Sequence, residues 1–493
     1  MAHTYAPTSS STATSRWPAL YVLCAGMLMI VLDQTVVNVA LPSIQNDLGF
    51  TQSGLAWVVN AYLIAFAGLL LLAGRLGDLV GRKRVLLSGL ILFTAASLLC
   101  AVSISQEMLV VARFIQGVGG ALASGLVLGM IVTMFPEARE RAKALGVFSF
   151  VAAAGGSIGL LAGGFLTQAI NWHWIFFINL PIGIAAVILV TRLIESDPGL
   201  GLSEGADAAG AVFVTAALML GVYTIVSISD AGHDSTWSLV LGGIALTLLV
   251  SFVVRQATAA NPLLPLSIFR SRNVSGANLI QVLWIAGLFG MFFLGTLYLQ
   301  RVLGYDPLQI GLAFMPLAIT IGGLSVDYAA RVITRFGARS VLLVGLVLVL
   351  AGLLLLTRAP IDGQYLTDVL PVMLLIGLGA GVAFPALMTL AMSGATSSDA
   401  GLASGLVNTT AQVGGALGLA VLATLASART EALLAAGASM PAALTGGYHL
   451  AFAVSAGLVV AAIVVAALVL RPAPAEGREP ARLHETPAVD SAS

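Results

Sequence analysis

The sequence predicts an all-α integral membrane protein, and two observations carry that prediction: the composition and the length of the apolar runs. Hydrophobic residues make up 59% and charged residues only 9% of the 493 positions, and the mean hydropathy is +1.01. Soluble domains carry roughly 25% charged residues. The formal net charge is zero, with the cations spread over short loops, so no basic face for nucleic acid is indicated. The two cysteines lie in apolar runs and are expected to pack in the core.

A run of roughly 20 apolar residues is long enough to cross a bilayer as a helix, and the sequence predicts fourteen such transmembrane spans. The first run is too long for the apolar part of a signal peptide and lacks a small-residue cleavage site, so it is expected to remain as the first helix. The expected extents are 17–41, 54–73, 85–104, 108–135, 145–170, 174–193, 209–229, 237–254, 274–299, 309–332, 341–356, 369–392, 404–426 and 448–470.

The arginines and lysines predict the orientation in the membrane. If the N-terminus lies inside, the outer segments hold only Arg301, Arg358 and Arg429 of the 22 cations, and Arg113 lies within a span. All the others then fall on cytoplasmic segments, which normally carry the excess of Lys and Arg. The sequence therefore predicts that both termini are cytoplasmic.

A weak internal repeat predicts the division of the chain. Arg335-Phe-Gly-Ala-Arg339 before the eleventh span resembles Val80-Gly-Arg-Lys-Arg84 before the third. An offset of eight spans implies two six-helix halves with two extra helices between them, and paired halves with a site at their interface are typical of transporters. The expected segments are a Ser/Thr-rich disordered tail over 1–16, an N-terminal half over 17–193, the insertion over 194–273, a C-terminal half over 274–470 and a cytoplasmic tail over 471–493.

Asp33 and Arg113 are the clearest charges inside the predicted spans. Their distances in sequence from Leu41 and Met108 place them about 12 Å and about 8 Å below the same membrane face, at 1.5 Å per residue. A charge at that depth needs a partner or a water-filled cavity. One interpretation is a static ion pair that holds two helices together. The other is proton coupling, in which the carboxylate loads and releases a proton as its surroundings change.

A charged loop, G-R-L-G-D-L-V-G-R-K-R from Gly74 to Arg84, connects the second and third predicted spans. Gly74, Gly77 and Gly81 are expected to allow tight turns at the helix ends, and the four cations should hold the loop on the cytoplasmic side. Asp78 is placed to pair with a cation or with the positive end of a neighbouring helix. The simpler alternative is a hairpin that only fixes topology.

Glycines recur every four residues in the fifth predicted span. Gly155, Gly159 and Gly163 form a stripe on one face, with Gly156 and Gly164 alongside. This helix is therefore expected to pack closely against a neighbour, and tight packing alone would explain the stripe.

Polar and aromatic side chains inside other spans are candidates to line a substrate cavity, although sequence alone does not say which of them face it. They are Asn38, Asn60, Tyr62, Gln116, Gln281, Trp284, Asn408 and Gln412. No metal site or cofactor is indicated, because the five histidines are scattered over loops and helix ends. The sequence also lacks a phosphate-binding G-K-S or G-K-T loop, which disfavours an ATP-driven pump.

Four of these stretches resemble motifs of the major facilitator superfamily, specifically its fourteen-span drug/proton antiporter branch, and the hydropathy match covers about residues 17–470. Leu32-Asp-Gln-Thr-Val-Val-Asn-Val-Ala-Leu-Pro42 resembles the first-helix motif, and the charged loop from Gly74 resembles the loop motif. Arg113-Phe-Ile-Gln-Gly117 resembles the fourth-helix motif, and the glycine stripe resembles the fifth-helix antiporter motif G-x-x-x-G-P-x-x-G-G. The four together are specific, whereas any one alone is weak.

The resemblance implies roles for these residues. Asp33 and Arg113 would take part in proton coupling. The residues that would lock the cytoplasmic side in one of two alternating states are Gly74, Asp78, Gly81 and Arg82. Those of the antiporter-motif helix are Gly155, Gly159, Gly163 and Gly164. Leu160 departs from the pattern, because the family has there a proline that bends the helix and is associated with exchange rather than symport.

The leading functional hypothesis is a proton-motive-force-driven efflux transporter of amphipathic organic compounds, such as drugs or antibiotics, that works by alternating access. It would act as a monomer in the plasma membrane of a bacterium, with the substrate, protons and lipid as its partners. The alternative is a uniporter or symporter of one specific metabolite with the same fold. A membrane-embedded enzyme is disfavoured, because the sequence places no His/Glu or His/Asp cluster inside the spans.

Overall fold

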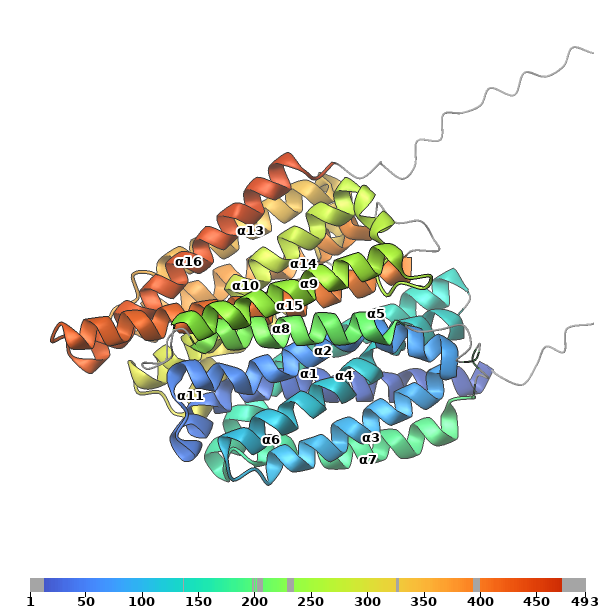
Figure 1. Ribbon diagram of the computed structural model, residues 1–493, viewed down its shortest axis with the longest axis horizontal. Coiled ribbons are helices and arrows are strands. Elements are labelled where there is room, and N and C mark those ends of the chain that lie inside the picture. Colours follow the sequence, from blue (N-terminus) through green and yellow to red (C-terminus); the bar gives the residue numbers. More distant parts are fainter. Residues whose placement is uncertain are drawn as a thin grey trace, which may run out of the picture.

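A computed structural model describes residues 13–471 except 136, 197–198, 200, 202–206, 228–234, 325–327 and 393–399. The described chain forms one bundle of helices that run in roughly a common direction (Figure 1). Most of both predicted tails, residues 1–12 and 472–493, lies outside the described residues. The predicted disordered tail extends to residue 16, but α1 begins at Ala13, so the prediction is wrong for residues 13–16.

Each predicted span overlaps one helix or two consecutive helices. Their bounds in chain order are α1 (Ala13–Leu48), α2 (Gln52–Val80), α3 (Arg82–Ala101), α4 (Gln106–Met134), α5 (Ala138–Ala169), α6 (Trp174–Phe177), α7 (Asn179–Leu193), α8 (Ala208–Ser227), α9 (Ser235–Thr258), the 3-10 helix η2 (Leu266–Arg270), α10 (Arg272–Arg301), α11 (Pro307–Gly323), α12 (Ala329–Phe336), α13 (Ala338–Leu356), the π-helix η4 (Tyr365–Val369), α14 (Leu370–Met392), α15 (Ala400–Ala435) and α16 (Met440–Leu468).

The lengths of these helices suit a membrane. Within the described residues, 12 helical segments are long and apolar enough to cross a bilayer. Two shorter apolar segments, Ile158–Ala169 and Pro307–Gly323, lie at the predicted fifth and tenth spans. The all-helical membrane class is confirmed, and the count of fourteen spans stays a prediction.

Single residues explain two of the helix boundaries. Gly81 separates α2 from α3 with a φ of 106°, a conformation that favours glycine. The prediction that Gly74 and Gly77 also turn the chain is wrong, because both lie inside α2. Pro181 has no N–H to bond the carbonyl of Phe177, four residues earlier, and the predicted sixth span is broken at Ile178 into α6 and α7. Asn179 is therefore the first residue of α7.

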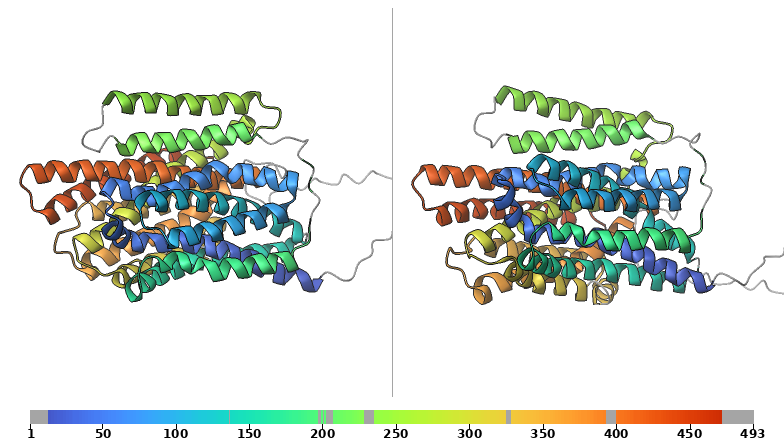
Figure 2. Two further views of the ribbon diagram at one scale, coloured as in Figure 1. Left: turned by 60° about the horizontal axis from the view of Figure 1, so that its bottom comes forward. Right: turned by 90° about the horizontal axis from the view of Figure 1, so that it is seen from below.

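The helices pack in two sets with a pair beside them. Extensive contacts connect α1 with α5 and α7 and connect α4 with α2 and α3. A second set of contacts joins α10 to α15 and α16 and joins α13 to α14 and α16, and the two sets lie on opposite sides of the bundle (Figure 1). α8 and α9 form a pair on the outside, where α8 packs on α2 and α15 (Figure 2). The exact segment boundaries inferred from the repeat stay a prediction.

A buried carboxylate fastens the ends of the α8–α9 pair. Asp207, just before α8, accepts hydrogen bonds from Arg255 Nε at 2.8 Å, Gln256 Nε2 at 2.7 Å and Gly210 N at 2.9 Å. Burial raises the pKa of the Asp207 carboxyl, but the hydrogen bonds and the Arg255 charge outweigh burial and hold that pKa below its ordinary value. The Asp207 carboxylate that connects α8 with α9 is therefore ionised at neutral pH.

The glycine stripe of α5 lies against α1, as the four-residue period predicts. A Cβ on Gly155 would meet the Leu28 and Val31 side chains, and one on Gly163 would lie 2.8 Å from the Val36 carbonyl oxygen. Gly164 faces a different helix, since a Cβ there would lie 2.6 Å from the Pro307 carbonyl oxygen at the start of α11. Helix α5 thus contacts α1 on one face and α11 on another.

We expect Gly163→Ala to lower the free energy of unfolding by about 1–3 kcal/mol, because the added methyl group overpacks the backbone contact with α1. Gly156→Ala is the matched control on the same helix, since nothing lies within 4 Å of its added Cβ. The control should match or exceed the wild-type stability, because alanine is a better helix former than glycine. Thermal unfolding in detergent measures both, and equal losses in the two variants would contradict the packing.

Candidate functional site

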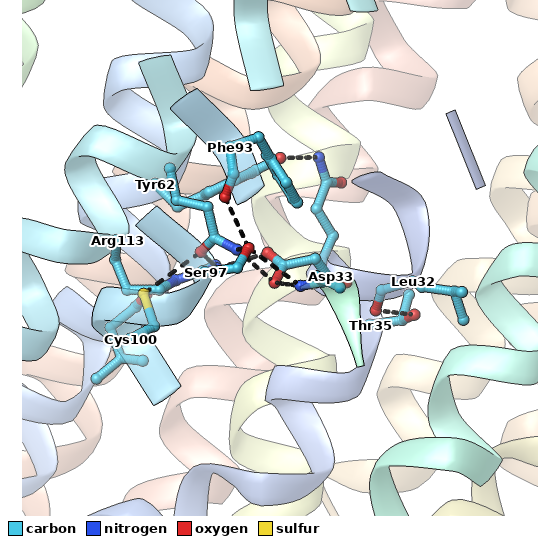
Figure 3. A network of polar contacts seen from close by, with 12 residues as sticks. Leu32, Asp33, Thr35, Tyr62, Phe93, Ser97, Cys100 and Arg113 are labelled. Atoms are coloured by element: carbon cyan, nitrogen blue, oxygen red, sulfur yellow. Dashed lines mark hydrogen bonds and ion pairs between the residues drawn. The ribbon is translucent and has the colours of Figure 1, made fainter. Parts of the chain in front are cut away.

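Asp33 and Arg113 form an ion pair in the interior, as their matched depths predict (Figure 3). Arg113 Nη1 lies 2.6 Å from Asp33 Oδ2, and the two side chains are 2% and 0% exposed. α1 supplies the carboxylate and α4 the guanidinium. Two opposite charges out of contact with solvent compensate one another only if their remaining hydrogen-bonding positions are also filled.

The second oxygen of the carboxylate is also hydrogen-bonded. Asp33 Oδ1 accepts from Gln116 Nε2 at 2.7 Å and from Asn179 Nδ2 at 2.9 Å. Three donors from α4 and α7 thus surround one carboxylate, and all the side chains are fully buried. Both oxygens of the Asp33 carboxylate therefore accept hydrogen bonds from neighbouring helices.

Gln116 is held in one orientation by contacts at both ends of its amide. Its Oε1 accepts from Arg113 Nη1 at 2.6 Å and from Cys100 Sγ at 3.6 Å. Its Nε2 donates to Ser97 Oγ at 2.8 Å as well as to Asp33. Ser97 Oγ in turn donates to the Phe93 carbonyl at 2.8 Å, within the same turn of α3.

The rest of the guanidinium is bound to α2. Arg113 Nε donates to the Val58 carbonyl at 2.9 Å, and the guanidinium carbon lies 4.4 Å from the centre of the Tyr62 ring. A cation over an aromatic face is stabilised by the ring quadrupole. Gly117 permits this approach, because a side chain there would collide with the Tyr62 carbonyl.

The structure brings together only part of the predicted set. Asp33, Arg113, Tyr62 and Gln116 meet in this cluster, although Tyr62 and Gln116 were expected to line a cavity. Sequence reasoning missed Ser97 and Asn179. Asn179 carried a usable signal, as an amide inside an apolar span, whereas a single serine is too common to stand out.

The charged loop contacts the ends of two other helices. Arg82 Nη2 lies 3.1 Å from Asp78 Oδ1, and both side chains are partly exposed. Arg82 Nη1 donates to Thr133 Oγ1 of α4 at 3.4 Å, and Lys83 Nζ donates to the Thr191 carbonyl of α7 at 2.9 Å. Asp78 therefore pairs with a cation of its own loop. Its role in gating stays a prediction.

The other predicted cavity residues differ in how well they are paired. Asn60 is fully buried, and neither of its amide atoms has a hydrogen-bond partner among the described residues. Gln281 Oε1 accepts from Trp284 Nε1 at 2.8 Å, while Gln281 Nε2 is unpaired within the same described set. Asn38 donates to the Gln34 carbonyl one turn away. Asn408 and Gln412 are partly buried on α15. That these residues share one cavity stays a prediction.

A small apolar cleft lies between α1, α3, α4 and α7. Its lining includes Leu23, Met27, Leu90 and Val127, and it contains none of the predicted cavity residues. The cleft offers no polar group to orient a substrate.

A bundle of membrane-length helices around a buried carboxylate–arginine cluster defines a polytopic membrane transporter. The chain belongs to the Major Facilitator Superfamily, whose family model matches residues 23–419. It is accordingly a multi-pass transporter and not an enzyme, and the predicted all-α major-facilitator fold is confirmed.

Curated relatives match most of the chain. It is 38% identical over 451 residues to the puromycin resistance protein pur8 of Streptomyces alboniger, covering 90% of this chain and 89% of that protein. It is 36% identical over 480 residues to the cephamycin export protein CmcT of Amycolatopsis lactamdurans, covering 97% and 96%. A solved structure of the peptide transporter POT in complex with sulfate matches with a TM-score of 0.67 and 15% identity, covering 92% of this chain and 95% of that one. That likeness shows the fold alone.

Breaking the buried pair from one side should be worse than removing both charges. We expect Arg113→Met to lower the free energy of unfolding by about 3–5 kcal/mol, because Asp33 is left buried without its counter-charge. The double variant Asp33→Asn/Arg113→Met should recover a large part of that loss. Thermal unfolding of the purified proteins in detergent measures the difference, and losses that simply add would contradict the pairing.

Proposed function

We propose that this protein exports amphipathic organic compounds of the antibiotic type, driven by proton antiport in which Asp33 binds and releases the proton. The observation that carries the proposal is the Asp33 cluster, a fully buried carboxylate on α1 held by donors from two other helices. An ionisable group inside a membrane bundle is a functional candidate by default.

The relatives support the export of antibiotics. Two proteins that match nearly the full chain are named for puromycin resistance and for cephamycin export. Their names are the reason for choosing a drug-like substrate over an ion or a sugar.

The polar groups of the interior favour neutral or weakly charged substrates. Asn60 can donate and accept hydrogen bonds, and the unpaired amide nitrogen of Gln281 can donate them, without either group carrying a charge. Asp33 is already saturated by three donors in this state, so it offers little to a cationic substrate. We infer that a bound compound is oriented by amides and aromatic rings such as Trp284.

Proton uptake by Asp33 would change both the net charge and the hydrogen bonding of the cluster. Neutralising the carboxylate removes the counter-charge of Arg113 and turns an acceptor of three hydrogen bonds into a group that also donates. A change of this kind can shift a two-state equilibrium whose states differ by a few kcal/mol. We propose that it switches the transporter between its inward- and outward-open states, with both termini cytoplasmic in a bacterial plasma membrane.

A second candidate is a symporter or uniporter of one metabolite, and α5 favours it. The helix runs without interruption from Ala138 to Ala169 and carries Leu160 where the antiporter motif has proline. Antiport predicts that the substrate and the protons cross the membrane in opposite directions, whereas symport predicts that they cross in the same direction. The sign of gradient-driven flux therefore separates the two.

The transport test uses purified protein in liposomes with an imposed pH gradient, and follows puromycin and a cephamycin. We expect gradient-driven flux opposite to the proton flow in the wild type. Asp33→Asn should reduce it to the background of empty liposomes, because the variant carries no titratable group at this position. Flux that survives in Asp33→Asn would remove Asp33 from the coupling, and flux without any gradient would indicate a uniporter.

The charged loop provides a separate test of gating. Asp78→Asn removes the ion pair with Arg82 and should reduce the transport rate several-fold while leaving membrane insertion and thermal stability near wild type, since exposed pairs contribute about 0–1 kcal/mol. Asp306→Asn, which also removes one carboxylate, is the matched control, because asparagine caps α11 as well as aspartate does. Normal transport by a normally expressed Asp78→Asn variant would remove the gating role.

A further inference from the structure

Asn179 differs from the other donors to Asp33, because one end of its amide is free. The side chain is fully buried at the start of α7, and its Nδ2 donates to Asp33 Oδ1 at 2.9 Å. Its Oδ1 has no hydrogen-bond partner among the described residues. A buried amide oxygen without a donor is unfavourable, so its presence requires an explanation.

The explanation lies in what Asp33 needs when it takes up a proton. Asp33 Oδ2 faces the Arg113 guanidinium, so the proton is favoured on Oδ1. The new O–H group is then a buried donor and needs an acceptor in place of the N–H groups that pointed at it.

Two of the three neighbouring polar groups cannot supply this acceptor. Gln116 would have to turn its amide, which breaks its bonds to Arg113 and Ser97 at once. Ser97 Oγ already donates to the Phe93 carbonyl and accepts from Gln116 and, at 3.4 Å, from Asn179, so both of its lone pairs are used. Asn179 can turn at the loss of only its 3.4 Å contact with Ser97, because its oxygen makes no hydrogen bond among the described residues.

We propose that Asn179 is a positioning residue that follows the protonation state of Asp33: its amide nitrogen donates to the ionised carboxylate, and its amide turns so that Oδ1 accepts from the protonated one. The inference rests on the proposed proton coupling at Asp33. The titratable or charged groups that the adjoining helices present to this cluster are Tyr62 on α2, Cys100 on α3 and Arg113 on α4. None of them replaces the Asn179 amide as acceptor for protonated Asp33. Arg113 can only donate, Tyr62 is hydrogen-bonded to Gln34, and Cys100 is hydrogen-bonded to Gln116.

Variants at residue 179 should change the pH at which Asp33 takes up its proton. Asn179→Leu keeps a similar shape but removes both functions. The ionised form then loses a charge-assisted hydrogen bond, which is about twice as strong as the neutral bond lost by the protonated form. We expect proton uptake to move to higher pH by about one unit, a tenfold change in proton affinity. Asn179→Ser keeps a group that both donates and accepts but is one atom shorter, so its shift should be smaller than that of Asn179→Leu.

The measurement is a pH titration of the full-length protein in lipid by infrared difference spectroscopy. The carboxyl band that disappears in Asp33→Asn reports Asp33 directly, without any transport. Asn278→Leu is the matched control, because Asn278 is another buried, hydrogen-bonded amide but pairs with Thr410 on α15. It should leave the Asp33 midpoint unchanged. In Asn179→Leu the band of the protonated form should also move in frequency, because its O–H has lost its acceptor.

The outcomes separate the inference from the proposed function. A wild-type midpoint in Asn179→Leu, or an equal shift in Asn278→Leu, would overturn the role of Asn179 while leaving Asp33 as the proton site. A midpoint shift with no change in band frequency would overturn the turning of the amide. An Asp33 that never titrates would overturn both proposals. If Asn179→Leu does not fold, Asn179→Asp replaces it, and its second carboxylate should raise the midpoint above that of Asn179→Ser.

Discussion

The negative charge of Asp33 inside the bundle is the constraint that the first helices satisfy together. A carboxylate in hydrocarbon is costly unless it is paired and hydrogen-bonded. Helix α4 supplies Arg113 and Gln116, α7 supplies Asn179, and α3 orients Gln116 through Ser97. Local features make these contacts geometrically available: Gly117 lets α4 approach α2, and the break before Pro181 sets Asn179 at the start of α7.

The helix that carries the charge is also connected by close packing to the other set of helices. A Cβ on Gly159 would collide with the Thr35 side chain, two residues after Asp33, and would lie 3.2 Å from the Leu32 carbonyl oxygen, so the backbones of α1 and α5 come close together. On another face of α5, the Leu160 carbonyl oxygen would lie 2.7 Å from a Cβ on Gly311 of α11. A shift of α1 on proton uptake would therefore press on α5 and through it on α11. Proton binding would then be coupled to helix rearrangement through the packing contacts of α5 with α1 and α11.

The sequence predicts best the features that depend only on the positions of residues along the chain. Apolar run length predicts the helices, and counting residues from the span ends predicts that Asp33 and Arg113 meet. The four-residue glycine period likewise predicts the close face of α5. Sequence could not identify Asn179 or Ser97 as partners, because their contacts depend on how α3 and α7 pack around α1. Gly74 and Gly77 did not end α2, because glycine permits a turn without requiring one.

The central claim is that Asp33 exchanges a proton for substrate, and proton release by the purified transporter tests it most directly. Detergent-solubilised protein in weakly buffered solution is mixed with puromycin, and a pH indicator follows the protons released, with binding measured in parallel. The account predicts release by the wild type and none by Asp33→Asn. Binding of puromycin without proton release in the wild type, or equal release by the variant, would contradict it.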